Sequence, residues 1–252
     1  MQLKIMVKRL VVIFITVFLT ACVSTKKEMP PLPKDEQVDL YLQMGARYLE
    51  MGMLEVAKGN LEKAEEVDPD NANVHNALGA LHERMKQFPE AKKEYQKAVE
   101  LDANNFGAIN NYGRFLCERG EIDEGLSLLN DALSLPLNNR KWFAYTNLGR
   151  CELNNGNSEQ AENHFRAALQ INRKFSPALF EMQKISYHSE NYMSARAFLE
   201  RYLAVSQHTA QSLWYAVQTE RALNNQQSAD AYQGKLFNLF PTSKEARQLK
   251  IQ

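Results

Sequence analysis

The chain of 252 residues is poor in the residue types that mark unusual protein classes, with 11 glycines, 8 prolines and 3 cysteines. Glycine and proline are scattered, which excludes collagen-like and long low-complexity segments. Charge of one sign is also lacking, because 30 basic residues balance 30 acidic residues. Residues 1–21 contain three of the basic residues and no acid, so the remainder has a net charge of −3. This argues against a nucleic-acid-binding protein, which would need a dominant basic surface.

Catalytic signatures are missing as well. The chain contains no His-Glu-x-x-His, Gly-x-Ser-x-Gly or P-loop pattern. His75 and His82 lie seven residues apart, on one face of an expected helix, which raises the question of a zinc site. No cysteine or third ligand is suggested nearby, so we interpret both as core or half-buried histidines. The sequence therefore predicts no enzyme, metal, cofactor or small-molecule substrate.

Long hydrophobic runs are absent too. The longest apolar run is short and lies at the N-terminus. Leu10 to Leu19 is apolar except for Thr16, and it follows a positive segment with Lys4, Lys8 and Arg9. A run of about ten residues is too short to span a bilayer core and is typical of a signal peptide. Residues 1–21 are therefore predicted to be a signal peptide.

The end of this segment resembles a bacterial lipobox. It reads Leu19-Thr20-Ala21-Cys22, and the resemblance implies that the thiol of Cys22 carries the lipid. The alternative is an ordinary secretory signal with a chance cysteine. Val23, in place of an aspartate, resembles the sorting signal for the outer membrane in Gram-negative bacteria. We expect residues 22–37, with several prolines, to form a tether that holds the rest of the chain in the periplasm.

The rest of the chain repeats with a period of about 34 residues. Four glycines recur, and each is followed twelve residues later by a second small residue. The phase continues through Ala195 and Ala229, and two extra residues lie near Pro136 to Arg140. This pattern predicts helical hairpins whose two helices approach closely where the small residues lie. The paired positions are Gly45 and Ala57, Gly79 and Ala91, Gly113 and Gly125, and Gly149 and Ala161.

This pattern resembles the tetratricopeptide repeat (TPR) family. The first unit carries the motif most clearly, with Gly45, Ala57, Leu61, Ala64 and Pro69. The resemblance implies an all-α fold, a right-handed TPR solenoid of six hairpins. Gln183 and Val217 replace the first glycine in the last two units. The expected units are 38–71, 72–105, 106–141, 142–175, 176–209 and 210–243, and residues 244–252 are expected to extend or cap the last helix.

The resemblance also implies a partner-binding groove along the first helices of the units. Mapping the family's groove positions onto this chain gives an apolar first unit, a middle with asparagines and a column of cations, and aromatic residues in the last units. The alternatives are that the cations pair with local acids such as Glu118 or Glu152, and that the tether covers the apolar residues. The predicted groove residues are Leu42, Ala46, Leu49, Asn76, Asn110, Arg114, Arg150, Phe180, Lys184, Tyr187 and Trp214.

Two cysteines remain outside the N-terminal segment. Cys117 and Cys151 lie on the expected first helices of neighbouring units, which pack together in TPR proteins. In an oxidising periplasm they could form a disulfide, and the alternative is two buried free thiols.

Several stretches resemble one branch of this family more closely, the type IV pilus biogenesis lipoproteins of the PilF/PilW group. They are residues 110–117 (NNYGRFLC), 163–169 (NHFRAAL), 211–214 (QSLW) and 240–246 (FPTSKEA). This resemblance implies a pilotin, a lipoprotein that binds the pilus secretin and helps it reach the outer membrane and form its multimer. The alternative is a TPR scaffold for outer-membrane barrel assembly or for cell-envelope enzymes.

Overall fold

The protein is described by a computed structural model that covers residues 32–136 and 138–251, and the regular structure in these ranges is entirely helical. The all-α prediction is confirmed. The helices form six antiparallel hairpins followed by one further helix. Their bounds are α2 (Lys34–Glu50), α3 (Leu54–Val67), α4 (Ala72–Arg84), α5 (Phe88–Leu101), α6 (Phe106–Glu118), α7 (Ile122–Ser134), α8 (Lys141–Asn154), α9 (Ser158–Ile171), α10 (Ser176–His188), α11 (Tyr192–Leu203), α12 (Ala210–Ala222), α13 (Gln226–Leu239) and α14 (Lys244–Ile251).

Each hairpin is packed around the small residues that define the repeat. A Cβ atom added to Gly79 would lie 2.6 Å from the ring of Tyr95, and one added to Gly149 would lie 2.6 Å from the ring of Phe165. Both aromatic side chains are fully buried. The glycines are therefore needed because a large side chain of the second helix occupies the space above them.

The turn inside each hairpin is three residues long, and its middle residue has a positive φ. Glycine occupies this position in three hairpins, for example Gly120 with φ 87°. Lys86, Glu190 and Asn224 adopt the same conformation without being glycine, with φ between 56° and 61°. In the second hairpin the amide of Gln87 then donates to the carbonyl of His82, which closes the end of the helix.

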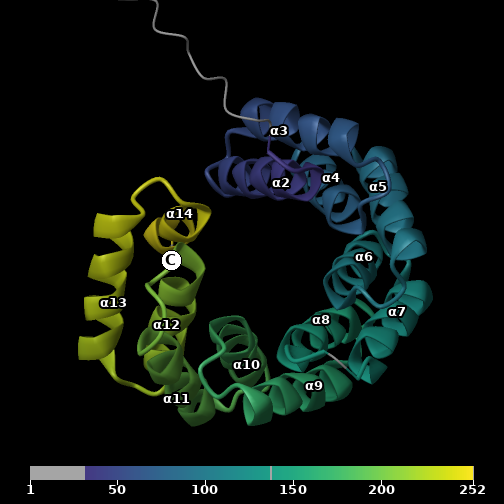
Figure 1. The fold of residues 1–252 in the computed structure, drawn as a ribbon. Coiled ribbons are helices and arrows are strands. Elements are labelled where there is room, and N and C mark those ends of the chain that lie inside the picture. Colours follow the sequence, from purple (N-terminus) through teal and green to yellow (C-terminus); the bar gives the residue numbers. More distant parts are fainter. Residues whose placement is uncertain (1–31, 137, 252) are drawn as a thin grey trace, which may run out of the picture.

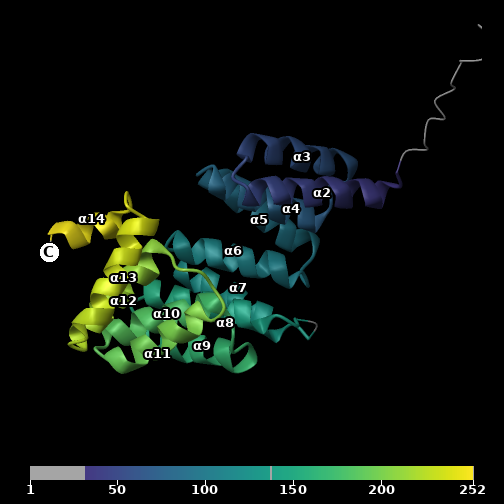
Figure 2. The same cartoon turned by 90° about the vertical axis from the view of Figure 1, so that its left-hand side faces the viewer.

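The hairpins stack into a superhelix with an inner and an outer layer. Viewed along its axis, the even-numbered helices line a central opening and α3, α5, α7, α9, α11 and α13 lie outside them (Figure 1). In both views the first hairpin, α2 and α3, lies on the opposite side of the superhelix from α9 and α11 (Figures 1 and 2). The core runs along the stack, because each outer helix also packs against the inner helix of the next hairpin.

The start of the repeat array differs from the expectation, and its C-terminal end follows one of the two expected forms. The helix α2 begins at Lys34, so residues 34–37 are helical and do not belong to the tether. Pro33 precedes this helix and Asp35 and Glu36 occupy its first turn, where acids stabilise the N-terminal end of a helix. Residues 244–251 form a separate helix instead of extending α13, because the chain turns at Phe240 to Ser243. This helix packs against α12 and α13 and buries Ala246 and Leu249.

Candidate protein-binding surface

The inner surface of the first three hairpins contains a pocket with a volume of about 420 Å³. Three of the predicted groove residues line it: Ala46 and Leu49 on α2, and Arg114 on α6. Ala46 is exposed, and its small side chain leaves the space that the pocket occupies. The remaining lining residues come from the ends of α2 and α4, and they are Glu50, Ala80, Glu83 and Arg84.

Leu42, one turn before Ala46, has a different environment. Its side chain packs, half-buried, against the core of the first hairpin, as does that of Leu49. The two leucines thus contribute to the core as well as to the inner surface. The tether, which was the alternative cover for these leucines, lies mostly outside the described residues.

At one side of the pocket, charged and polar side chains form a network of hydrogen bonds and ion pairs. The two terminal nitrogens of Arg114 donate to the carboxylate of Glu83 at 2.8 and 2.6 Å, and Arg114 also lies 3.0 Å from Glu118. The hydroxyl of Tyr95 donates to Glu83 at 2.8 Å. Burial alone would raise the pKa of Glu83, but the hydrogen bonds and charge of Arg114 outweigh it and lower this pKa. Arg114 is therefore fixed in place by α4.

The other two cations of the predicted column are also paired. The Nε of Arg150 donates to Glu181 at 3.0 Å, and the Nζ of Lys184 donates to the other oxygen of Glu181 at 2.6 Å. Glu181 is only 5% exposed. Buried or half-buried acids therefore compensate all three cations of the column, which agrees with the alternative that they pair with acids of this chain. Glu118 is one of the acids weighed from the sequence, but Arg150 pairs with Glu181 of the next hairpin and not with Glu152.

Each of the two predicted asparagines, Asn76 and Asn110, accepts a hydrogen bond from an asparagine on the next inner helix. Asn111 donates to the side-chain oxygen of Asn76 at 3.0 Å, and Asn147 donates to that of Asn110 at 3.1 Å. Asn110 is 8% exposed. These side chains therefore hold successive hairpins together, and their oxygens already have a donor.

The predicted aromatic residues of the last two hairpins form one cluster. The ring centroid of Tyr187 lies 6.1 Å from that of Trp214, and the ring centroid of Phe180 lies 6.4 Å from that of Tyr215. Tyr215 links the three predicted residues, because it also contacts Tyr187 and Trp214. Tyr215 was not among the residues predicted from the sequence. Its position next to Trp214 is the feature that could have indicated it. The helices that carry this cluster, α10 and α12, lie across the central opening from α2 and α4 (Figure 1).

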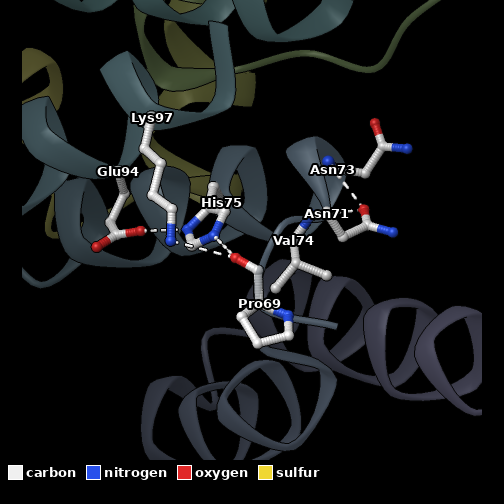
Figure 3. Close-up of polar contacts among 7 residues, drawn as sticks. All are labelled: Pro69, Asn71, Asn73, Val74, His75, Glu94 and Lys97. Atoms are coloured by element: carbon white, nitrogen blue, oxygen red, sulfur yellow. Dashed lines mark hydrogen bonds and ion pairs between the residues drawn. The ribbon is translucent and has the colours of Figure 1, made fainter. Parts of the chain in front are cut away.

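His75 lies at the junction of the first two hairpins and is fully buried (Figure 3). Its Nδ1 is 2.6 Å from a carboxylate oxygen of Glu94, and its Nε2 is 2.7 Å from the carbonyl oxygen of Pro69. Lys97 donates to the same carbonyl at 3.2 Å. Burial alone would lower the pKa of His75, but the hydrogen bonds to Glu94 and Pro69 outweigh it and raise this pKa.

These contacts bear on metal binding. Glu65, His75 and Glu94 offer ligand atoms within 4.8 Å of one another. However, both ring nitrogens of His75 already face hydrogen-bond acceptors. This arrangement suits a doubly protonated ring, in which no lone pair is free for a metal ion. His82 bonds instead to Gln87, at 2.8 Å. The two histidines considered for zinc therefore have separate partners, and His75 ties the first hairpin to the second.

Cys117 on α6 and Cys151 on α8 are joined by a disulfide, with their Cα atoms 5.2 Å apart. Both residues are buried. The bond connects the inner helices of the third and fourth hairpins, so it fixes the stack near its middle.

The predicted lipidation site Cys22, the predicted signal peptide and most of the predicted tether lie outside the described residues. In the part of the chain that the structure does describe, none of the helices has the length and apolar character needed to cross a bilayer.

Comparison with known proteins agrees with this architecture. Family models of the tetratricopeptide repeat match residues 72–105, 94–126 and 144–175. The stacked hairpins and their inner surface thus define a TPR protein, a class that mediates protein–protein interactions.

A more specific relationship follows from a match over nearly the whole chain. The type IV pilus assembly protein PilF of Pseudomonas aeruginosa is 30% identical over 98% of this chain and 99% of its own length. A solved structure of P. aeruginosa PilF has a TM-score of 0.72 at 30% identity, over 86% of this chain and 98% of that one. The structure of PilW, a type IV pilus biogenesis factor, has a TM-score of 0.74 at 24% identity, over 84% of this chain and 97% of that one. The chain belongs to this family of type IV pilus biogenesis TPR proteins.

Proposed function

We propose that the protein is an outer-membrane lipoprotein pilotin, anchored through Cys22, which binds the type IV pilus secretin and promotes its localisation and multimerisation. The match to PilF over nearly the full length of both chains supports a role in pilus assembly. The predicted lipobox supports the anchor. The observation that carries the binding mode is the pocket between α2, α4 and α6, which gathers Ala46, Leu49 and Arg114 at one end of the inner surface.

The chemistry of this pocket suits a short apolar segment of a partner. Ala46, Leu49 and Ala80 provide apolar surface, and Glu83, Arg84, Glu50 and Arg114 provide a charged rim. Interfaces with an apolar centre and a polar rim gain most of their binding free energy from the centre. Because Arg114 is already held by Glu83 and Glu118, it would orient a partner without losing much side-chain entropy on binding.

A deletion and complementation experiment tests this function. The deletion strain should lose pili, twitching and secretin multimers, while other outer-membrane barrels assemble normally. The wild-type gene should restore all three, and Ala46→Glu should not, although its protein is folded and reaches the membrane. Ala103→Glu, which changes an exposed alanine in the loop after α5, is the matched control and should restore them.

The alternative scaffold function predicts a different result. A general failure of barrel assembly in the deletion strain would contradict the pilotin proposal and favour barrel assembly. Normal secretin multimers in the deletion strain would also contradict it. Replacing Cys22 by alanine tests the anchor separately, since it should release the protein from the outer membrane.

A further inference from the structure

A second pocket lies on the outer surface, between α9 and α11, and has a volume of about 570 Å³. Three arginines line it together with one leucine and one phenylalanine. We call it the outer arginine pocket, and its lining residues are Arg166, Leu169, Gln170, Arg173, Phe198 and Arg201. In Figure 1, α9 and α11 lie in the outer layer, away from the inner surface discussed above.

The three arginines are held differently. The guanidinium of Arg201 lies 5.3 Å from the ring centroid of Phe198 and donates to the carbonyl of Arg173 at 3.3 Å. Arg166 pairs with Glu162 one helical turn earlier, at 2.6 Å. Among the described residues, neither Arg173 nor Arg201 forms an ion pair with an acid. The positive charge of the three arginines therefore exceeds the negative charge of the one acid, Glu162, that pairs with them.

Comparison with an equivalent junction shows that the fold does not require these arginines. Three units earlier, the positions of Arg166, Leu169, Gln170 and Phe198 are occupied by Glu62, Glu65, Glu66 and Glu94. The backbone contact is the same at both junctions, since Lys97 donates to the carbonyl of Pro69 at 3.2 Å as Arg201 does to Arg173. The cation at the position of Lys97 and Arg201 therefore has a structural role, because it binds a backbone carbonyl at both junctions. Arg166, Arg173 and the two apolar lining residues, Leu169 and Phe198, are features of this junction.

We propose that the outer arginine pocket is a second docking site, which binds an acidic segment of a partner protein. Guanidinium groups bind carboxylates with two parallel hydrogen bonds, and Phe198 and Leu169 can cover an apolar side chain next to the acids. The arginines are exposed, so a small free anion would gain little in this solvated site. A segment that covers the pocket removes the water and strengthens each contact.

The position of the pocket favours a protein over a membrane surface. The chain enters the repeat array at α2, whereas α9 and α11 lie on the opposite side of the ring of helices (Figures 1 and 2). A tether that precedes α2 would bring the first hairpin close to the membrane and leave this pocket distant from it. Because this site is on the outer layer, its occupant can bind while the inner pocket is filled. The protein would then connect two partners.

The experiment uses detergent-solubilised full-length protein and a fluorescein-labelled peptide of alternating glutamates and leucines. Fluorescence anisotropy should show binding of this peptide, and a peptide with glutamine in place of glutamate should bind at least tenfold more weakly. Arg166→Glu together with Arg173→Glu should weaken binding of the acidic peptide at least tenfold. Lys58→Glu with Lys63→Glu, on the outer helix α3, changes the net charge equally and should weaken it less than twofold.

Several results would overturn the proposal. They are no binding of the acidic peptide, equal binding of both peptides, or equal weakening by the two double variants. Loss of binding to anionic phospholipid vesicles in the arginine variant, without an effect on the peptide, would assign the pocket to a membrane. Loss of self-association in sedimentation would assign it to a second copy. If the double variant does not fold, Arg173→Glu alone, in the loop after α9, carries the same test. Secretin binding by the inner pocket is a separate measurement, so either proposal can fail alone.

Discussion

At the scale of single residues, the small side chains at the helix crossings were the clearest signal in the sequence, and they also have the clearest structural reason. Gly79 and Gly149 are each covered by a buried aromatic ring. The environment of His75 could not be read in the same way. Its partners are a carbonyl in the preceding loop and a carboxylate on α5, and only the packed junction brings them to its two nitrogens.

Gly79→Ala should destabilise the protein by about 1–3 kcal/mol, because its Cβ would overlap the ring of Tyr95. Gly59→Ala is the control, since that glycine lies within α3 and a Cβ there meets nothing within 4 Å. It should stabilise the protein by up to about 1 kcal/mol through higher helix propensity. Urea denaturation measures both free energies of unfolding. Equal effects of the two substitutions would contradict the packing described here.

The pair of His75 and Glu94 should make stability depend on pH. The pKa of His75 is raised in the folded state, so its contribution is complete below the unfolded pKa of about 6.5 and is lost as pH rises through the folded pKa. The pKa of Glu94 is lowered, mainly by the hydrogen bond from His75, so its contribution is lost as pH falls. His75→Leu with Glu94→Gln removes both contributions, and leucine is the equivalent residue, Leu179, in the fifth hairpin.

Urea denaturation of wild type and of this double variant at several pH values between 5 and 9 checks the prediction. The wild type should lose free energy of unfolding relative to the variant as pH rises above about 6.5. Parallel stability curves across this range would show that the charged histidine contributes nothing.

At the scale of helices and hairpins, the sequence predicted the paired helices but not which charges pair between them. Arg114 bonds to Glu83 and Arg150 bonds to Glu181, and both separations are 31 residues. This spacing is one repeat less one helical turn, so a search at that interval could have found both pairs. The outer arginine pocket was missed because its cations lie on two helices and a loop, and a pattern within one helix does not gather them.

The disulfide belongs to this scale, since it connects α6 and α8 across a separation of 34 residues. Replacing Cys117 and Cys151 by alanine should lower the free energy of unfolding by roughly 2–4 kcal/mol, because a closed loop of this length restricts the unfolded chain. Denaturation with and without reductant, together with mass measurement after alkylation, checks this. Unfolding that does not depend on reductant would argue for two free thiols.

At the scale of the whole molecule, the repeat phase was enough to predict an all-α solenoid, because each hairpin repeats the same packing. The ends were harder to predict. Pro241 cannot continue α13, so residues 244–251 fold back as α14 instead of extending it, and the acids of the first turn start α2 earlier than expected. The residues proposed for the inner surface have two kinds of environment. The pocket contains three of the proposed residues, whereas most of the others proved to hold the stack together.

The central claim is that the pocket around Ala46 binds the pilus secretin, and a direct binding measurement tests it best. Purified secretin in detergent would be titrated onto immobilised full-length protein, with wild type, Ala46→Glu and Ala103→Glu compared by biolayer interferometry. We predict that wild type and Ala103→Glu bind with the same affinity and that Ala46→Glu binds at least tenfold more weakly while its circular dichroism spectrum is unchanged. Absence of secretin binding by wild type, or undiminished binding by Ala46→Glu, would contradict the account.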